Sequence, residues 1–506
     1  VQFITVLEIN LVCLSGEIEE MRKREEWLIV QILWFCTSIS VGKSNPATIC
    51  IVGSGIGGSS VAHFLRVYDP PTPLKILMFE KSSQVGGRMA TVTISGETFE
   101  AGASILHPKN YHVSNFTRLL NLQRKAPPSS EKDLSLGIWN GKHFLFKTIT
   151  LDSRIPFAGK ITQFINYAQL FFRYGFSLLK MERFVEDTVN KFLKYYEPHD
   201  SRPVFETASE MLKWADLKNL TTRTLHEELV GIGLSPLLIQ ELITAITRIN
   251  YGQSSEISGL AGMISLAGSS DGLWAVEGGN WRMADGLISA SDVDLHLEEE
   301  ITSISCEVER CELKSSGGRR YACDVAVVAS PLDEENIVFT PAIALPKREM
   351  QHTHVTFVRG AINPEYFGLE SATEVPKLVG TIEDASMPFS SVSVLKEKGE
   401  DEVFYKVFSR EEMSERVLDD LFKERKETVR IDWAAYPHYN APEVFAPFVL
   451  GDRRIYYVNA FENAASTIEV SAVAAENIAR LIASRFTGSS GSSSTNHLQG
   501  VSHSEL

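Results

Sequence analysis

The sequence contains few cysteines and no excess of positive charge. Six cysteines occur among 506 residues and none forms a CxxC pair, which argues against a zinc site and against a disulfide-rich scaffold. The formal net charge of −15 argues against a nucleic-acid partner, because phosphate binding needs a basic surface. The remaining composition, 44% hydrophobic and 22% charged, is ordinary for a globular protein, and the length predicts two or more domains around a large core.

A long hydrophobic run is also missing near the N-terminus. Residues 27–41 are apolar, but this stretch is shorter than the roughly 20 residues that a membrane span needs. It follows the basic residues 22–24 and precedes a polar stretch, which is the layout of a secretory signal peptide. We predict that the native chain starts at Met21, that residues 1–42 are an upstream extension and signal peptide, and that cleavage falls near residues 40–43. An uncleaved signal anchor is the alternative.

Cleavage there would leave four cysteines. Cys50 lies inside the first predicted strand, which favours a buried thiol, whereas a bridge among Cys306, Cys311 and Cys323 stays open. The sequons at Asn115 and Asn219 predict N-glycosylation of a lumenal protein. The Ser/Gly-rich tail, residues 487–506, predicts disorder, and its last residues, HSEL, are only weakly similar to an endoplasmic-reticulum retention signal.

Strand and helix patterns alternate in the first part of the chain and return later. Residues 48–53 predict a strand, residues 57–67 a helix and residues 74–80 a second strand, and strand patterns recur near residue 325 and in the C-terminal part. We expect an α/β fold with one Rossmann-type nucleotide-binding domain built from discontinuous segments and an inserted helical and mixed-sheet substrate domain. The predicted nucleotide-binding segments are 46–150, 291–335 and 446–486, and the substrate-domain segments are 151–290 and 336–445.

A phenylalanine-rich region lies within the first of these substrate-domain segments. Its aromatic residues recur along a helical stretch with Lys and Arg between them: Phe157, Phe164, Phe171, Phe172, Phe176, Phe184 and Phe192. The pattern favours a buried helical core, and an apolar substrate pocket or a membrane-facing patch are the two alternatives.

The stretch ICIVGSGIGGSSVAHFL, residues 49–65, places a glycine-rich turn between a strand and a helix. It matches G-x-G-x-x-G in the context that dinucleotide binding requires. Such glycines permit a tight turn, close approach of a pyrophosphate and packing of the helix on the strand. A carboxylate follows about 20 residues later at a strand end, where it holds ribose hydroxyls and disfavours a 2′-phosphate. The cofactor residues predicted here are Gly53, Gly55, Ile56, Gly57, Gly58, Glu80 and Lys81.

The next stretch, EKSSQVGGRMATVTISGETFEAGASIL, resembles the flavin-containing amine oxidase superfamily, in which an acidic strand end precedes GGR. The resemblance implies FAD as the cofactor, with Gly86 and Gly87 approaching it and Arg88 at its diphosphate or flavin edge. It implies further contacts from segments that match the superfamily in order: Gly102, Ala103 and Ser104 beside the isoalloxazine, the backbone near Ile301 at adenine, and Ala329 near the dinucleotide.

The C-terminal stretch NAFENAASTIEV stands where the superfamily has its last flavin contact, which assigns Glu462, Ala465 and Ser466 to the cofactor site. Backbone N–H groups near Ala465 and Ser466 are expected to stabilise negative charge on reduced flavin. The sequence departs here from the common glycine-rich version.

Three stretches narrow the resemblance to the prenylcysteine oxidase family: NYGQSSEISGLAGMISLAGSSDGLWAVEGGNWRMADGL, AGASILHPKNYHVSNFTRLLNL and YYVNAFENAAS. The resemblance covers most of residues 46–485. It implies oxidative cleavage of S-farnesyl- or S-geranylgeranyl-cysteine with O2 and water to a prenyl aldehyde, free cysteine and hydrogen peroxide. It also implies the secretory pathway, with a lysosome or vacuole as destination and the endoplasmic reticulum as an alternative. Peripheral contact with a membrane surface stays open.

The catalytic residues are open at this point. His107, Trp274 and Trp281 are pocket candidates near the flavin motifs, with a structural histidine and core tryptophans as equal alternatives. Two rival functions also stay open. One is another oxidase of the superfamily, acting on amines or porphyrins, and the other is a prenyl-binding escort protein without redox chemistry.

Overall fold

The computed structural model describes residues 46–125, 135–149, 158–198, 201–270, 272–307, 309–399, 402–451 and 454–488. The predicted signal peptide and Phe157 lie outside these residues. The predicted disordered tail also lies outside them, except for residues 487 and 488, which end a helix. Residues 47–506 group into one compact unit, and the description below concerns that unit alone.

A six-stranded sheet brings together strands from three distant parts of the chain. Its order is β20 (Val449–Leu450), β21 (Ile455–Tyr457), β13 (Val325–Val328), β1 (Ala47–Val52), β2 (Leu74–Phe79) and β9 (Val293–His296). All neighbours are parallel except the β20–β21 pair. β1 and β13 are almost entirely buried, as expected of continuous apolar strands inside a parallel sheet. The predicted Rossmann-type domain of discontinuous segments is thereby confirmed.

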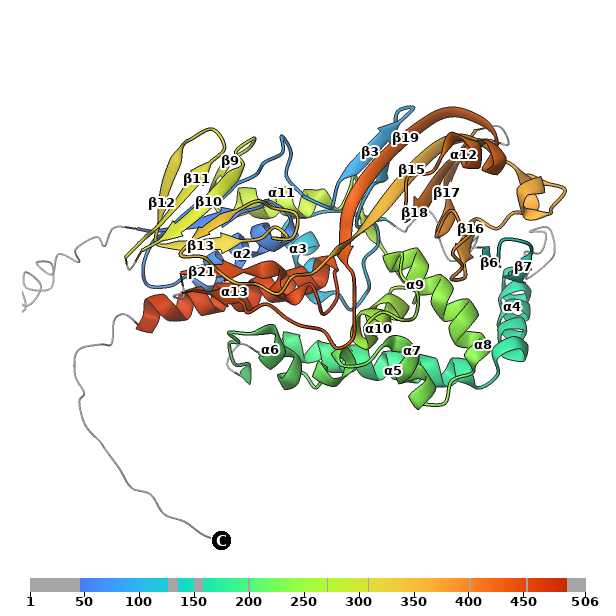
Figure 1. Cartoon of the computed structure of the whole chain (residues 1–506), viewed down its shortest axis with the longest axis horizontal. Coiled ribbons are helices and arrows are strands. Elements are labelled where there is room, and N and C mark those ends of the chain that lie inside the picture. Colours follow the sequence, from blue (N-terminus) through green and yellow to red (C-terminus); the bar gives the residue numbers. More distant parts are fainter. Residues whose placement is uncertain are drawn as a thin grey trace, which may run out of the picture. The chain divides into compact units, whose positions relative to one another are not determined.

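Four helices accompany this sheet: α2 (Ile56–Tyr68), α3 (Tyr111–Leu119), α11 (Trp281–Ala290) and α13 (Ile468–Gly488). α2 packs against both α11 and α13, so the first and last helices of the unit lie side by side (Figure 1). Two smaller sheets are formed by strands that follow β2 and β9 in the sequence. One has the order β12 (Arg320–Cys323), β11 (Cys311–Ser315), β10 (Ile301–Cys306), β14 (Val338–Thr340), and the other pairs β3 (Thr91–Ile94) with β4 (Glu97–Glu100).

A seven-stranded mixed sheet forms the second large layer. Its order is β19 (Phe422–Pro437), β15 (Met350–Ile362), β18 (Val403–Ser409), β17 (Ser391–Glu397), β16 (Leu378–Thr381), β6 (Leu136–Trp139) and β7 (Phe144–Lys147). β15 and β19 pair along nearly their whole lengths and form the long curved ribbon of Figure 1. The chain also has β5 (Arg124–Lys125), paired with β8 (Ala275–Val276), and α12 (Glu415–Leu421).

The helical part of the insert lies within residues 158–267, whereas α11, which also falls in the predicted segment 151–290, packs on α2. The helical part consists of α4 (Ala158–Tyr174), α5 (Ser177–Phe192), α6 (Ala208–Trp214), α7 (Leu225–Gly231), α8 (Pro236–Leu238), α9 (Thr244–Tyr251) and α10 (Gly259–Ala267), with a π-helical turn at Ile239–Ile243. Short 3-10 turns lie at Leu193–Tyr196, Lys218–Thr221, Pro364–Phe367, Ala372–Glu374 and Val458–Phe461. α9 packs on β16, which joins the helices to the seven-stranded sheet.

Two disulfides involve the four-stranded sheet. One lies within that sheet, and the other links it to β1 of the six-stranded sheet. Cys50 of β1 is bonded to Cys323 of β12, and Cys306 is bonded to Cys311 across the β10–β11 hairpin. The prediction that Cys50 is a thiol is therefore wrong. Its partner is 273 residues away, and only the packing of β12 beside β1 brings the two sulfur atoms together.

Candidate functional site

The glycine turn lies at the carboxyl end of β1, between the ends of β2 and β13. Gly53 has φ +103°, and a Cβ atom there would lie 2.8 Å from the carbonyl oxygen of Ala329. A Cβ atom on Gly58 would lie 2.0 Å from the Gly53 carbonyl oxygen. Both positions therefore admit only glycine, and the second lets α2 pack directly on the strand.

The first turn of α2 is open to an anion. Its N-cap is Gly55, which has no side chain to cap the helix, and the first turn contains no acidic residue. The first N–H groups of α2 and the positive end of its dipole are therefore available to an anion at the helix N-terminus, as a pyrophosphate site requires. Ile56 and Gly57 begin the helix, and a Cβ on Gly57 would come within 3.1 Å of Val458.

Glu80 lies at the end of β2 with its carboxylate turned toward this turn. One oxygen accepts hydrogen bonds from the Ser54 amide at 3.0 Å and hydroxyl at 2.6 Å, and the other accepts from the Ser82 amide at 2.9 Å. The side chain is buried and fixed by these bonds. The first oxygen, Oε2, already accepts two bonds, whereas Oε1 accepts one and can accept a further bond, so this position suits a ribose hydroxyl.

A second glycine turn meets the first. The Gly86 amide donates to the Ser54 carbonyl at 3.2 Å, and Gly55 and Gly86 form an isolated parallel bridge. Gly86 and Gly87 both have positive φ, +115° and +56°. The structure therefore brings the GxGxxG turn and the GGR turn into backbone contact, although Gly55 and Gly86 are 31 residues apart in sequence.

The loop at residues 102–104 packs on the backbone of Arg88. A Cβ on Gly102 would lie 1.9 Å from the Arg88 carbonyl oxygen, and the Ala103 amide donates to that oxygen at 3.0 Å. Ser104 folds back, with its hydroxyl donating to the Gly102 carbonyl at 2.8 Å. Predicted cofactor residues from separate motifs thus lie next to one another.

Arg88 is held by a buried ion cluster. Its Nη2 lies 2.6 Å from Oε1 of Glu462, and its Nη1 donates to the Ala435 carbonyl at 2.7 Å. Glu462 is 4% exposed and also pairs with Arg348 at 3.2 Å. Burial alone would raise the pKa of Glu462, but the charges of Arg88 and Arg348 outweigh it and lower the pKa to about 2. The carboxylate therefore stays ionised and keeps Arg88 oriented.

The C-terminal contact differs from the expected arrangement at one atom. The Ser466 amide donates to the Tyr439 hydroxyl at 2.7 Å, and the Ser466 hydroxyl donates to Glu462 at 2.9 Å. The Ser466 N–H group is therefore engaged within the protein rather than directed at a ligand. Ala465 is buried beside it, and α13 begins two residues later, at Ile468.

The segment expected at adenine, which leads to Ile301, lies against the end of β2 at residues 80–82. The Glu299 amide donates to the Glu80 carbonyl at 2.8 Å, and the Glu298 amide donates to the Ser82 carbonyl at 3.1 Å. Ile301 follows at the start of β10 and is buried. Lys81 points to the surface and pairs with Glu335 at 2.9 Å.

The three pocket candidates have packing roles in this structure. His107 closes a turn, because its Nδ1 accepts from the Lys109 amide at 3.0 Å. Trp274 is buried, pairs with Leu106 through both backbone groups, and has the guanidinium of Arg124 4.0 Å from its ring centroid. Trp281 packs against the Gly86 turn, where a Cβ on Gly86 would lie 2.9 Å from the Cβ of Trp281.

Sequence reasoning missed a buried lysine beside the 102–104 loop. Lys406 of β18 donates to the Ser104 hydroxyl at 3.0 Å and to the Glu100 carbonyl at 2.9 Å. Burial lowers the pKa of Lys406 to about 8, against the attraction of Glu100, and burial raises the pKa of Glu100 to about 7. An isolated lysine inside FYKVFS carries no motif, so only the strand register could identify it. Arg348 was missed as well, because it lies in an irregular stretch before β15 and carries no motif either.

The described residues show no group of three or more His, Cys, Asp or Glu side chains arranged to bind a metal ion. In the same part of the chain, no helix is both long and apolar enough to cross a membrane. The geometry instead fits a dinucleotide. It offers an uncapped helix N-terminus between two glycine turns, a carboxylate at the adjacent strand end, and a fixed arginine. The fold and the site define a Rossmann-type dinucleotide-binding protein.

Comparison with known proteins narrows this class. Residues 157–495 match the prenylcysteine lyase family model, and residues 51–120 match an NAD(P)-binding Rossmann-like domain. The chain is 58% identical over 465 residues to farnesylcysteine lyase of Arabidopsis thaliana, a match covering 91% of this chain and 93% of that protein. It is 33% identical to human prenylcysteine oxidase 1, over 88% of this chain and 90% of the human protein. The chain belongs to the prenylcysteine lyase family, which confirms the predicted family.

Solved structures share the fold at low identity. Cyclohexylamine oxidase from Brevibacterium oxydans matches with a TM-score of 0.58 at 17% identity, covering 88% of this chain and all of that one. Putrescine oxidase bound to putrescine matches with a TM-score of 0.55 at 14% identity, over 87% of this chain and all of that one. These similarities support the predicted two-part α/β architecture.

The Glu100 carboxyl predicts a specific pH dependence of stability. Because its pKa is raised to about 7 in the folded state, the folded chain retains a proton that the unfolded chain has lost, and stability falls as the pH rises from about 4.5 to 7. Glu100→Gln should reduce this fall by on the order of 2 kcal/mol, as urea unfolding at pH 5 and pH 7 would measure. The exposed Glu424→Gln should follow the wild type. Equal slopes for wild type and Glu100→Gln would contradict the assignment.

Proposed function

We propose that this protein is an FAD-dependent oxidase that cleaves the thioether of S-prenyl-L-cysteine, consuming O2 and water and releasing a prenyl aldehyde, free cysteine and hydrogen peroxide. The observation that carries the proposal is the complete dinucleotide site in a chain 58% identical to a farnesylcysteine lyase. The substrates are S-farnesyl- and S-geranylgeranyl-cysteine, which arise when prenylated proteins are degraded.

The residues divide the work of holding the cofactor. The N-terminus of α2 and Arg88 bind the diphosphate, Glu80 binds the ribose, and the segment that leads to Ile301 lies at the adenine. Loop 102–104 borders the flavin ring. Glu462 fixes the orientation of Arg88 through their ion pair. When bound, FAD supplies the oxidising capacity for removing a hydride from the carbon beside the sulfur.

The rival functions lose support from the same geometry. An escort protein without redox chemistry has no need for a glycine turn in which Gly53 and Gly58 admit no side chain, or for a carboxylate aligned at the ribose position. The amine oxidases among the solved structures share the fold alone, at 14–17% identity. An amine substrate therefore rests on weaker grounds than a prenylcysteine.

Cofactor binding and substrate class can be tested together. The purified protein should be yellow and should release hydrogen peroxide with farnesylcysteine but not with putrescine. In Gly58→Ala the new Cβ would lie 2.0 Å from a backbone oxygen, so the glycine turn must open. We expect the flavin content of this variant, measured by absorbance, to fall by about tenfold or more. Gly159→Ala, which meets nothing within 4 Å, is the matched control and should bind flavin normally. A colourless, folded wild type, or peroxide release with putrescine alone, would refute the proposal.

We also propose that the protein resides in the secretory pathway, in a lysosome or vacuole, with the endoplasmic reticulum as the alternative. Disulfide pairing of all four cysteines between residues 50 and 323 supports an oxidising compartment. Both sequon asparagines, Asn115 in α3 and Asn219 in a 3-10 turn, have exposed side chains, as glycan attachment requires.

This location predicts two covalent signatures in protein isolated from its native cells. Peptide mapping should recover the Cys50–Cys323 and Cys306–Cys311 linkages, because oxidising compartments preserve such bonds. Deglycosylation should raise gel mobility, and Asn115→Gln with Asn219→Gln should abolish that shift. Unglycosylated protein with reduced cysteines would instead indicate a cytosolic location.

Contact with a membrane surface is a further part of the proposal. The Phe-rich region was expected chiefly as a core, but Phe172, Phe164 and Phe176 on and between α4 and α5 are 88%, 74% and 72% exposed. Lys160 and Lys180 are exposed near them in sequence. Apolar rings flanked by basic side chains suit the interface of an anionic bilayer, where a prenylated substrate would also partition.

Vesicle sedimentation tests this surface. Phe172→Ser with Phe176→Ser should lower the binding constant for phosphatidylcholine–phosphatidylserine vesicles by about tenfold or more, since two inserted rings are lost. Both side chains are exposed, so the fold should persist. Val338→Ser, an exposed apolar residue on β14, is the control. Equal binding by all three proteins would exclude α4 and α5 as the contact.

A further inference from the structure

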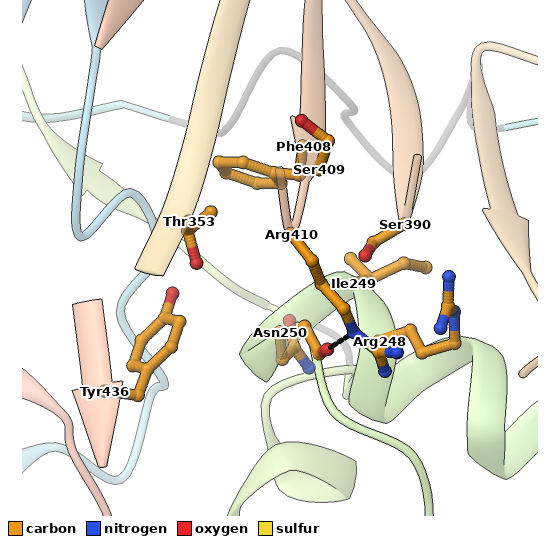
Figure 2. Close-up of a pocket in the computed structure, with 10 residues that line it drawn as sticks. Arg248, Ile249, Asn250, Thr353, Ser390, Phe408, Ser409, Arg410 and Tyr436 are labelled. Atoms are coloured by element: carbon orange, nitrogen blue, oxygen red, sulfur yellow. Dashed lines mark hydrogen bonds between the residues drawn. The ribbon is translucent and has the colours of Figure 1, made fainter. Parts of the chain in front are cut away.

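A small polar pocket lies where α9 meets the ends of β15, β18 and β19. Ten residues line it: Arg248, Ile249, Asn250, Gly252, Thr353, Ser390, Phe408, Ser409, Arg410 and Tyr436. In Figure 2, Tyr436 and Thr353 lie on one side and the two arginines on the other. We call this the arginine pocket.

The arginine pocket carries positive charge on its wall. Arg248 and Arg410 both line it, whereas Glu383, which pairs with Arg248 at 2.6 Å and with Arg410 at 2.7 Å, does not. Asp384 lies close enough to act on Arg248 but is exposed and also outside the lining. Among the described residues that line the pocket, the charged ones are therefore Arg248 and Arg410.

Both guanidinium groups have donors to spare. Arg248 uses three N–H groups, on Thr381, Glu383 and the Phe389 carbonyl, and Arg410 uses three on Glu383 and the Gly252 carbonyl. A guanidinium group has five N–H donors, so each retains two. Burial lowers the pKa of Arg248 despite the attraction of Glu383, and the nearby charge of Arg410 lowers it further.

The pocket also contains an unpaired hydroxyl. Thr353 is 8% exposed, and its Oγ1 is buried with no hydrogen-bond partner among the described residues. Such an atom loses free energy unless a ligand or water pairs with it. Figure 2 shows this oxygen on the same side of the pocket as the Tyr436 hydroxyl and directed toward it. Together with Asn250 and Ser390, these groups can accept bonds from an ammonium group.

The arginine pocket adjoins the candidate cofactor site. Tyr436 directly follows Ala435, whose carbonyl accepts a bond from Arg88. The ring of Tyr251 contacts both Tyr436 and Tyr439, with centroids 4.9 and 5.2 Å apart, and Tyr439 accepts the Ser466 amide bond. Contacts between tyrosine rings thus connect the lining of the pocket with the candidate cofactor residue Ser466.

We propose that the arginine pocket binds the amino-acid head group of the substrate, with the α-carboxylate on Arg410 and Arg248 and the α-ammonium among the neutral oxygens. This assignment rests on the proposed function. Only two carbon atoms separate the carboxylate from the thioether sulfur, so the head-group site must lie beside the oxidised carbon, as this pocket does. Planar guanidinium groups match a carboxylate with paired bonds.

The test compares ligands with and without the carboxylate. S-octylcysteine and S-octylcysteamine have no allylic carbon, so binding to the holoenzyme can be measured by calorimetry without turnover. The wild type should bind S-octylcysteine with a Kd about 10- to 100-fold lower than that for S-octylcysteamine, because the carboxylate adds charge-assisted hydrogen bonds. Arg410→Gln should remove most of this preference, and Thr353→Val, which keeps the shape but removes the hydroxyl, should weaken binding severalfold.

Arg430→Gln on β19 is the matched control, because it removes the same charge outside the pocket and should leave the preference intact. An Arg410→Gln protein that weakens both ligands equally, or neither, would overturn the inference. Turnover distinguishes the two proposals. If wild type and Arg410→Gln oxidise farnesylcysteine equally well, the head-group assignment is wrong but the proposed function stands. If the wild type binds the carboxylate ligand selectively but does not oxidise farnesylcysteine, the proposed function is wrong but the head-group assignment stands.

Discussion

The buried carboxylate of Glu462 joins three distant parts of the chain. It lies between the guanidinium groups of Arg88, from the first segment, and Arg348, from the stretch before β15. Arg88 in turn donates to Ala435 in β19, which belongs to the seven-stranded sheet. Arg88, the arginine of the GGR turn, thus links the first segment of the Rossmann-type domain to the seven-stranded sheet.

Such a cluster is costly to break. A carboxylate at 4% exposure is tolerated only because two cations and the side chains of Asn459 and Ser466 satisfy it. Losing one member would leave an uncompensated buried charge, which destabilises far more than losing a surface pair. The position of Arg88 is therefore set by the packing of the whole unit.

The parts that sequence reasoning predicted are those governed by short-range rules. The first strand, the glycine turn and Glu80 follow from a buried apolar run, fixed glycine spacing and a strand-end carboxylate. The structure adds the steric reason, since Gly53 and Gly58 face backbone oxygens of Ala329 and of the turn itself. Arg348, Lys406 and the residues of the arginine pocket belong to no motif, and only the tertiary packing of helices, strands and loops brings them near the cofactor residues.

Sequence alone determined the dinucleotide turn and the family, because both depend on residues that are local or ordered along the chain. Tertiary structure decided the partners. Cys50 is bonded rather than free because β12 packs beside β1, and the Ser466 amide meets Tyr439 instead of a ligand. It also decided that three phenylalanines on and between α4 and α5 face outward. The physical reason is the same in each case. Burial and pairing depend on groups that are distant in the sequence, 273 residues apart for Cys50 and Cys323 and 27 for Ser466 and Tyr439, and the chain's periodicity does not encode their contact.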